Sequence, residues 1–103
     1  MRNPSPVSVF AADIGRRDEA EYCSLKGGYV LEMQGYSPHS ICVLRVWVPV
    51  MPESSNSFNA HIVKDWNMRC ERWYNSRSEI EDIFESICSS EYSVEKFIEN
   101  GCI

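Results

Sequence analysis

The chain has 103 residues, of which 44% are hydrophobic and 24% are charged, a composition typical of a globular protein rather than a disordered one. This length is enough for one hydrophobic core, so we predict a single compact domain over residues 1–103. The formal net charge is −5, which disfavours general nucleic-acid binding because that depends on a basic surface.

No segment has the length of a membrane span. The longest apolar run, residues 46–51, is interrupted by Pro49, whereas a bilayer-spanning helix needs about 20 apolar residues. The opening sequence MRNPSP also lacks the apolar run of about 7 to 15 residues that marks a secretory signal peptide. We therefore expect a cytoplasmic protein without membrane association.

Five cysteines lie at positions 23, 42, 70, 88 and 102. Their number is odd, their spacing is wide and none forms a Cys-x-x-Cys pair, so neither a disulfide scaffold nor a zinc site is expected. We predict that all five are reduced. Cys42, Cys70 and Cys88 should be buried as small apolar side chains, and Cys102 should be more exposed.

The first two predicted elements are a strand and a helix. Apolar residues alternate with their neighbours over residues 6–12, which predicts a short strand. The segment 16–26 is rich in helix-forming residues and stops at Gly27 and Gly28, which can supply a left-handed helix end. We therefore expect a short helix there.

Two further strands are predicted over residues 29–33 and 41–50, which are rich in β-branched and aromatic residues. Turn-forming residues fill the segment 34–40 between them, so we expect an antiparallel hairpin. In the second strand, the face that carries Cys42, Leu44, Val46, Val48 and Val50 should face the core. Arg45 and Trp47 then lie on the other face, where a part of the chain or a partner covers them.

The segment that follows has two interpretations. Residues 51–59 form a predicted surface loop. Residues 62–74 then fit both a helical stripe and strand alternation, and aromatic enrichment favours a strand over residues 66–74.

The clearest element is a helix over residues 78–88, because its apolar side chains recur at helical spacing. Those side chains are Ile80, Ile83, Phe84, Ile87 and Cys88. Ser76 with Glu79, or Ser78 with Glu81, has the spacing of a capping box. A break at Ser89 and Ser90 should precede a second helix over residues 93–100, in which Ser93 is the N-cap. The predicted fold is α+β: an antiparallel sheet of three or four strands packed against a C-terminal helical pair.

Two candidate partner-binding surfaces follow from these elements. Glu81, Asp82 and Glu85 lie opposite the apolar stripe of the predicted helix, and residues 79–103 contain seven acidic residues and one Lys. Such a face suits a basic partner, although a solvated helix face has the same pattern. Arg69, Arg72 and Trp73 form the second candidate, because Arg and Trp are enriched at protein interfaces and stacking platforms.

Catalytic and metal-binding patterns are weak. His61 and Asp65 share a face only if their segment is helical, and two ligands do not make a zinc site. Glu81 and Glu85 on an exposed helix face lack the pocket that would tune them for acid–base catalysis. We therefore predict no catalytic residues, no metal and no cofactor.

We predict a small acidic protein-binding domain that inhibits a basic or nucleic-acid-binding protein by occupying its surface through the 78–88 helix. In size and charge the chain resembles small inhibitors, such as immunity proteins that cap toxins and phage proteins that block host defence complexes, a resemblance of class rather than of motif. The alternative is a structural or assembly subunit that uses the Trp/Arg patch at residues 66–77, and the third is a small enzyme. We expect a monomer or a small homo-oligomer.

Overall fold

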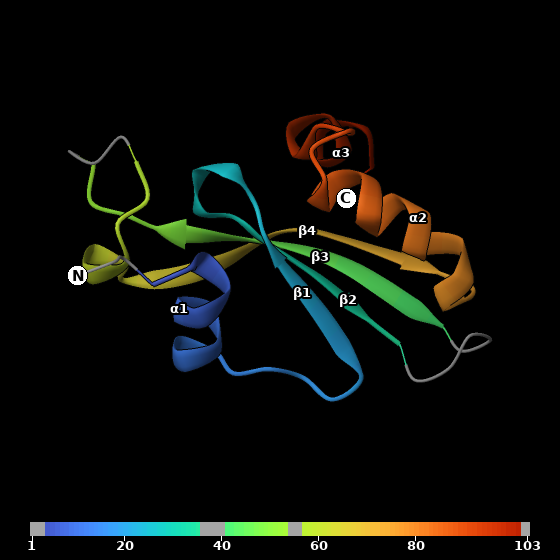
Figure 1. The fold of residues 1–103 in the computed structure, drawn as a ribbon, viewed down its shortest axis with the longest axis horizontal. Coiled ribbons are helices and arrows are strands. Elements are labelled where there is room, and N and C mark those ends of the chain that lie inside the picture. The colour runs from blue at the N-terminus through green and yellow to red at the C-terminus, as the bar shows by residue number, and fades with distance from the viewer. Residues whose placement is uncertain (1–3, 36–40, 54–56, 102–103) are drawn as a thin grey trace.

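A four-stranded antiparallel sheet forms the centre of the structure, with strand order β1-β2-β3-β4 (Figure 1). The computed structural model describes residues 4–35, 41–53 and 57–101. The helices and strands are α1 (Pro6–Asp13), β1 (Ala20–Ser24), β2 (Val30–Gln34), β3 (Cys42–Val50), β4 (Asp65–Tyr74), α2 (Arg77–Cys88) and α3 (Val94–Gly101), with short 3₁₀ turns η1 (Lys26–Gly28) and η2 (Ala60–Ile62). The predicted α+β class, with a sheet and a C-terminal helical pair, is confirmed.

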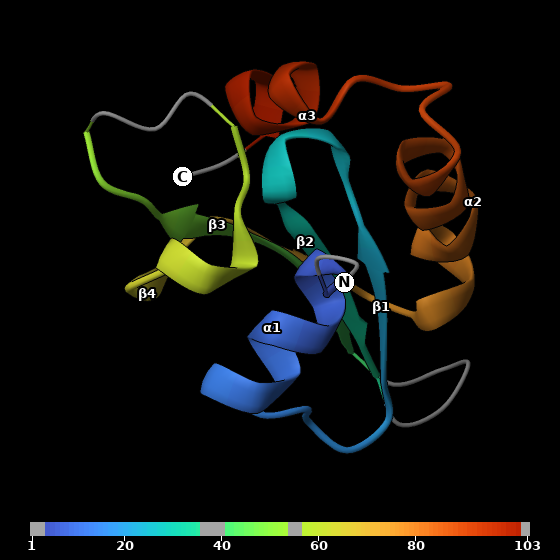
Figure 2. The ribbon, with the colours of Figure 1, turned by 60° about the vertical axis from the view of Figure 1, so that its left-hand side comes forward.

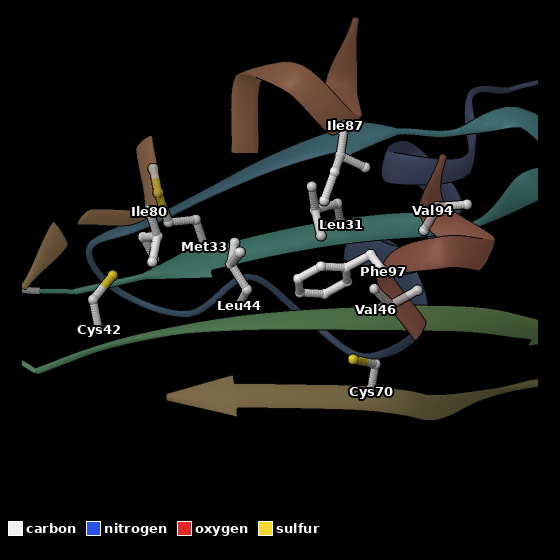
Figure 3. Close-up of a cluster of buried hydrophobic side chains, with 10 residues drawn as sticks. All are labelled: Leu31, Met33, Cys42, Leu44, Val46, Cys70, Ile80, Ile87, Val94 and Phe97. Atoms are coloured by element: carbon white, nitrogen blue, oxygen red, sulfur yellow. The ribbon is translucent and has the colours of Figure 1, made fainter. Parts of the chain in front are cut away.

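Helices cover both faces of the sheet: α2 and α3 lie on one side and α1 lies on the other (Figures 1 and 2). The cluster under α2 and α3 is the larger of the two (Figure 3). In it, Ile80 and Ile87 of α2 and Phe97 of α3 pack on the apolar side chains of the central strands. Cys42, Leu44 and Val46 are fully buried there, as predicted, whereas Val48 and Val50 of the same predicted core face are only half-buried.

The second cluster lies under α1, where Phe10 packs against Val30, Trp47 and Trp66. Phe10 is fully buried, and its ring meets that of Trp66 edge-on at a centroid distance of 5.4 Å. Trp47 is therefore covered by the chain itself. Among the described helices, none combines the length and the apolar character needed to span a membrane.

The predicted strand over residues 6–12 is wrong, because this segment forms helix α1. Pro6 occupies the first turn, where its missing N–H costs nothing. The Ser5 hydroxyl caps the helix by accepting a hydrogen bond from the Ser8 N–H at 3.2 Å. The helix-starting signals of Ser5 and Pro6 outweigh the strand-like alternation of apolar residues. The resulting helix packs Phe10 against the sheet.

The predicted helix over residues 16–26 is also wrong, because its second half forms strand β1. Tyr22 and Cys23 pair with Glu32 and Leu31 of β2 in an antiparallel register, so tertiary pairing overrides the helix propensity of the segment. Gly28 is needed in the turn between the two strands. Its φ is +85°, and a Cβ there would lie 2.3 Å from the Phe58 ring.

The remaining strand predictions are confirmed. β2 and β3 form the expected antiparallel hairpin, although residues 36–40 of the predicted turn lie outside the described residues. Residues 66–74 belong to strand β4, which resolves their ambiguity in favour of a strand. A bulge interrupts the β3–β4 register next to Val46 and Trp47.

The C-terminal helices begin and break close to where the sequence predicts. Ser76 is the N-cap residue of α2, but its side chain makes no capping hydrogen bond. The Glu79 carboxylate accepts a hydrogen bond from the Asn75 N–H at 3.2 Å, so the predicted capping box does not form in full. Ser90 has a positive φ of 67° after α2. The Ser93 hydroxyl then accepts a hydrogen bond from the Lys96 N–H at 3.4 Å. The predicted break and the predicted second helix are therefore confirmed.

The prediction that all cysteines are reduced is wrong. Cys23 of β1 and Cys88 at the end of α2 form a disulfide bond, with their Cα atoms 6.1 Å apart. Cys70 is disulfide-bonded as well, and Cys42 is a buried free thiol. Cys102 lies outside the described residues. Cys23 and Cys88 are 65 residues apart in the sequence, so their spacing gave no sign of a pairing that depends on α2 packing beside β1.

Candidate functional site

The three predicted acidic residues form one exposed surface on α2. Ile80 and Ile87 are 0% and 2% exposed and fix which side of the helix faces the sheet. At the helical period, Glu81, Asp82 and Glu85 then lie on the outer side, and all three are exposed. We call these three residues the acidic surface.

A shallow hollow of about 550 Å³ lies between this surface and strand β1. Glu21, Glu81 and Glu85 contribute carboxylates to its lining, and Met33 and Phe84 contribute apolar side chains. Carboxylates beside apolar side chains match a Lys or Arg side chain, whose aliphatic stem and charged head need different surroundings. The hollow is therefore suited to a basic side chain.

Two of the chain's own arginines bear on the charge of this hollow, and one of them, Arg16, is part of its lining. Arg77 pairs with Glu21 at 2.8 Å and with Glu81 at 3.6 Å, and the Arg16 guanidinium lies 5.5 Å from the centre of the Tyr22 ring. Asp82 and Glu85 have no ion pair within the described part of the chain. The charge of Glu81 is thus partly compensated, whereas Asp82 and Glu85 remain available to a partner.

The structure separates the residues of the second predicted surface. Successive residues of a strand point to opposite faces, so Arg72 lies under α3 whereas Trp73 lies on the α1 side of the sheet. The Arg72 guanidinium is 4.3 Å from the centre of the Phe97 ring. Trp73 is 58% exposed, and Arg69 is exposed at the bulge. Arg69 and Trp73 can share a surface, but Arg72 is not part of it.

A buried polar cluster, which the sequence reasoning missed, surrounds Glu32 at the centre of the sheet. Glu32 is fully buried. Its Oε2 accepts hydrogen bonds from the Tyr22 hydroxyl and, at 3.0 Å, from Arg17 Nη1. Its Oε1 accepts from Arg45 Nη1 at 3.1 Å and from Trp47 Nε1 at 3.2 Å. Each carboxylate oxygen therefore has two donors.

These donors determine the ionisation of the cluster. Burial alone would raise the pKa of Glu32, but hydrogen bonds from Tyr22, Arg45 and Trp47 and the charge of Arg17 together lower it. Burial and the neighbouring carboxylate raise the pKa of Tyr22. Glu32 is thus an ionised carboxylate that is closed off from solvent.

Neither the histidine candidate nor a metal cluster gains support from the geometry. His61 is exposed in the η2 turn, and Asp65 begins β4, so the two do not share a helix. Over residues 4–35, 41–53 and 57–101, no group of three or more His, Cys, Asp and Glu side chains is placed to hold a metal ion.

No protein-family model, curated protein or solved structure matches this chain. Its function has to be inferred from its own surfaces. The acidic surface combines three exposed carboxylates on one helix with an adjacent hollow.

Proposed function

We propose that this chain is a small protein-binding domain that inhibits a basic protein by covering part of its surface with the acidic surface of α2. The observation that carries the proposal is the hollow beside α2, where Glu81 and Glu85 line the same space as the apolar side chains of Met33 and Phe84. Asp82, also exposed, adds a third carboxylate on the same helix. Such a site suits Lys or Arg side chains of a partner.

The rigidity of α2 supports this proposal. The helix is fixed to the sheet by the buried side chains of Ile80 and Ile87 and by the disulfide between Cys23 and Cys88. A surface that is already ordered before binding loses little conformational entropy when a partner docks. The carboxylates can therefore act as a preformed array.

The charge distribution indicates the class of partner. Residues 77–101 carry seven acidic side chains and two basic ones, so the negative charge of the chain is concentrated in α2, α3 and their connection. Carboxylates on a rigid helix present negative charge as phosphates do, and they increase the rate of encounter with a basic surface. A nuclease or another nucleic-acid-binding protein fits this description, and direct binding of nucleic acid by this chain does not.

The cellular compartment is not determined by the fold, and the cytoplasmic location expected from the sequence is untested. The Cys23–Cys88 disulfide weighs against it, because glutathione and thioredoxin keep most cytosolic thiols reduced. An oxidising compartment is the better proposal. The basic partner would then be sought in the same compartment.

Reversing the acidic surface should remove binding while the fold survives. In the variant E81K/D82K/E85K, the exposed positions should each change the free energy of unfolding by no more than about 0.5 kcal/mol. Used as bait in extracts of the source organism, the wild-type chain should retain proteins with basic isoelectric points, and this variant should lose them. Mass spectrometry identifies the retained proteins.

The matched control reverses three other exposed acids. E91K/E95K/E99K changes the net charge by the same amount but leaves the acidic surface intact, because Glu91, Glu95 and Glu99 lie on or just before α3. This control should retain the same basic proteins as the wild type. Equal loss from both triple variants would mean that overall charge alone governs binding, and equal retention by all three proteins would contradict the proposal.

A further inference from the structure

Strand β4 is an open edge of the sheet. It spans ten residues, Asp65–Tyr74, and within the described chain it pairs only with β3. The outer N–H and C=O groups of an edge strand are a template for another strand, and proteins commonly protect such edges with Lys or Pro. Neither residue type occurs in β4, and its one register irregularity lies at Arg69, so the strand on either side of this bulge is suited to pairing.

Apolar side chains stand exposed along this edge. Trp73 is 58% exposed and Met68 is 47% exposed, and both line a hollow of about 370 Å³. Arg45 lies 5.8 Å from the centre of the Trp73 ring, and Trp73 Nε1 donates a hydrogen bond to Glu71 at 3.3 Å. The indole is therefore held in one orientation, as expected of an interface anchor.

Two charged residues beside Trp73 complement each other. Arg69 is exposed, is skipped by the β3–β4 register, and has no ion pair in the described part of the chain. Glu71 is held by Arg45 at 2.8 Å, and its side chain is still 31% exposed. If two β4 strands pair antiparallel about a two-fold axis at Cys70, Arg69 of each copy lies opposite Glu71 of the other. The edge is thus complementary to itself.

We propose that a second copy of this chain docks on the β4 edge, so that the two sheets continue across a two-fold axis and the Trp73 side chains are covered. This interaction goes beyond the proposed inhibition and uses a different surface. Because the acidic surface is carried by α2 on the side of β1, the dimer would present two copies of it. Failure of either proposal leaves the other standing.

Charge exchange between the two copies tests this pairing. The chain mass is 11.9 kDa, and the wild type should show twice that mass by sedimentation or light scattering at about 0.1 mM. R69E and E71R should each be monomers, because each variant alone places like charges opposite one another. An equimolar mixture of the two should recover the dimer, since Glu at one edge then faces Arg at the other.

W73A gives a second readout that does not depend on charge. Loss of a buried interface Trp should raise the dimer dissociation constant at least about tenfold, while the melting temperature at monomer concentrations stays close to that of the wild type. E71R could unfold because Arg45 loses Glu71 as its partner. In that event W73A still tests whether the β4 edge forms the dimer. Wild-type protein at 11.9 kDa under these conditions, or W73A with wild-type dimer affinity, would overturn the proposal. A monomer that binds an extended peptide of another protein at this edge would overturn it too.

Discussion

Replacing Glu32 by Ala is expected to lower the free energy of unfolding by about 3 kcal/mol or more. The reason is that removing one partner of a buried ion pair leaves the other charge uncompensated, at a typical cost of about 3 to 5 kcal/mol. Arg45 is 13% exposed and keeps Glu71 as an ion-pair partner at 2.8 Å, and Arg17 is 36% exposed and can turn to solvent. The expected loss therefore lies at the lower end of that range. Denaturant unfolding followed by circular dichroism measures it.

Glu21 provides the matched control for this substitution. It lies on the neighbouring strand and pairs with Arg77, but its side chain is 57% exposed. A surface ion pair contributes only about 0 to 1 kcal/mol, so Glu21→Ala should have a small effect. If Glu21→Ala and Glu32→Ala lowered the free energy of unfolding by similar amounts, the conclusion that the buried Glu32 carboxylate stabilises the α1 face of the sheet would be contradicted.

The same carboxylate predicts how stability depends on pH. The pKa of Glu32 is lowered in the folded protein, so its stabilising contribution is fully present above the ordinary Glu pKa of about 4.3. That contribution is lost as the pH falls through the lowered folded-state pKa. Glu32→Gln removes the titration, so its unfolding free energy should be lower at neutral pH and should fall less on acidification. Parallel acid profiles for the two proteins would contradict this role.

Ile80→Asp is expected to unfold the domain. Ile80 is fully buried between α2 and the sheet (Figure 3). Burying an unpaired carboxylate there costs several kcal/mol, against a total stability of about 5 to 15 kcal/mol for a typical domain. Loss of the cooperative thermal transition in circular dichroism is the expected result.

A second substitution on the same helix separates burial from helix propensity. Ile83 is only half-buried, so an Asp there can reach water and Ile83→Asp should be milder than Ile80→Asp. Both variants place the same residue inside α2. A wild-type melting temperature for Ile80→Asp would mean that α2 is rotated away from the observed packing.

The elements predicted correctly are those in which local pattern and tertiary environment agree. The stripe of α2 recurs at helical spacing, and Ile80 and Ile87 do face the core. Much of both faces of β3 is buried, by α2 and α3 on one side and by α1 on the other. A strand of largely β-branched and apolar residues fits this environment. For these segments, the sequence carries the same information as the packing.

The two N-terminal predictions are wrong because neither segment has a local pattern strong enough to decide. Alternation over residues 6–12 is equally compatible with a capped helix that uses only Phe10 as its buried anchor. β1 becomes a strand through its pairing with β2, a contact that helix propensity does not reveal. The loss of one predicted strand and the gain of another left the overall class unchanged.

The candidate site divides in the same way. The acidic surface could be predicted because Glu81, Asp82 and Glu85 belong to one helix, whose geometry fixes their common side. The Glu32 cluster joins residues from three separate segments of the chain, so only a weak signal was present: one acid within an apolar strand. Arg72 and Trp73 were grouped by composition, and strand alternation separates them.

The association rate of the basic partner, measured by stopped-flow or surface-based kinetics at two ionic strengths, tests the central claim most directly. Between about 0.1 M and about 1 M salt the Debye length falls from about 10 Å to about 3 Å, so the wild-type rate should fall steeply. At the lower salt, E81K/D82K/E85K should associate at least about tenfold more slowly, whereas E91K/E95K/E99K should be closer to the wild type. A triple variant of the acidic surface that associates at the wild-type rate at low salt would contradict the claim.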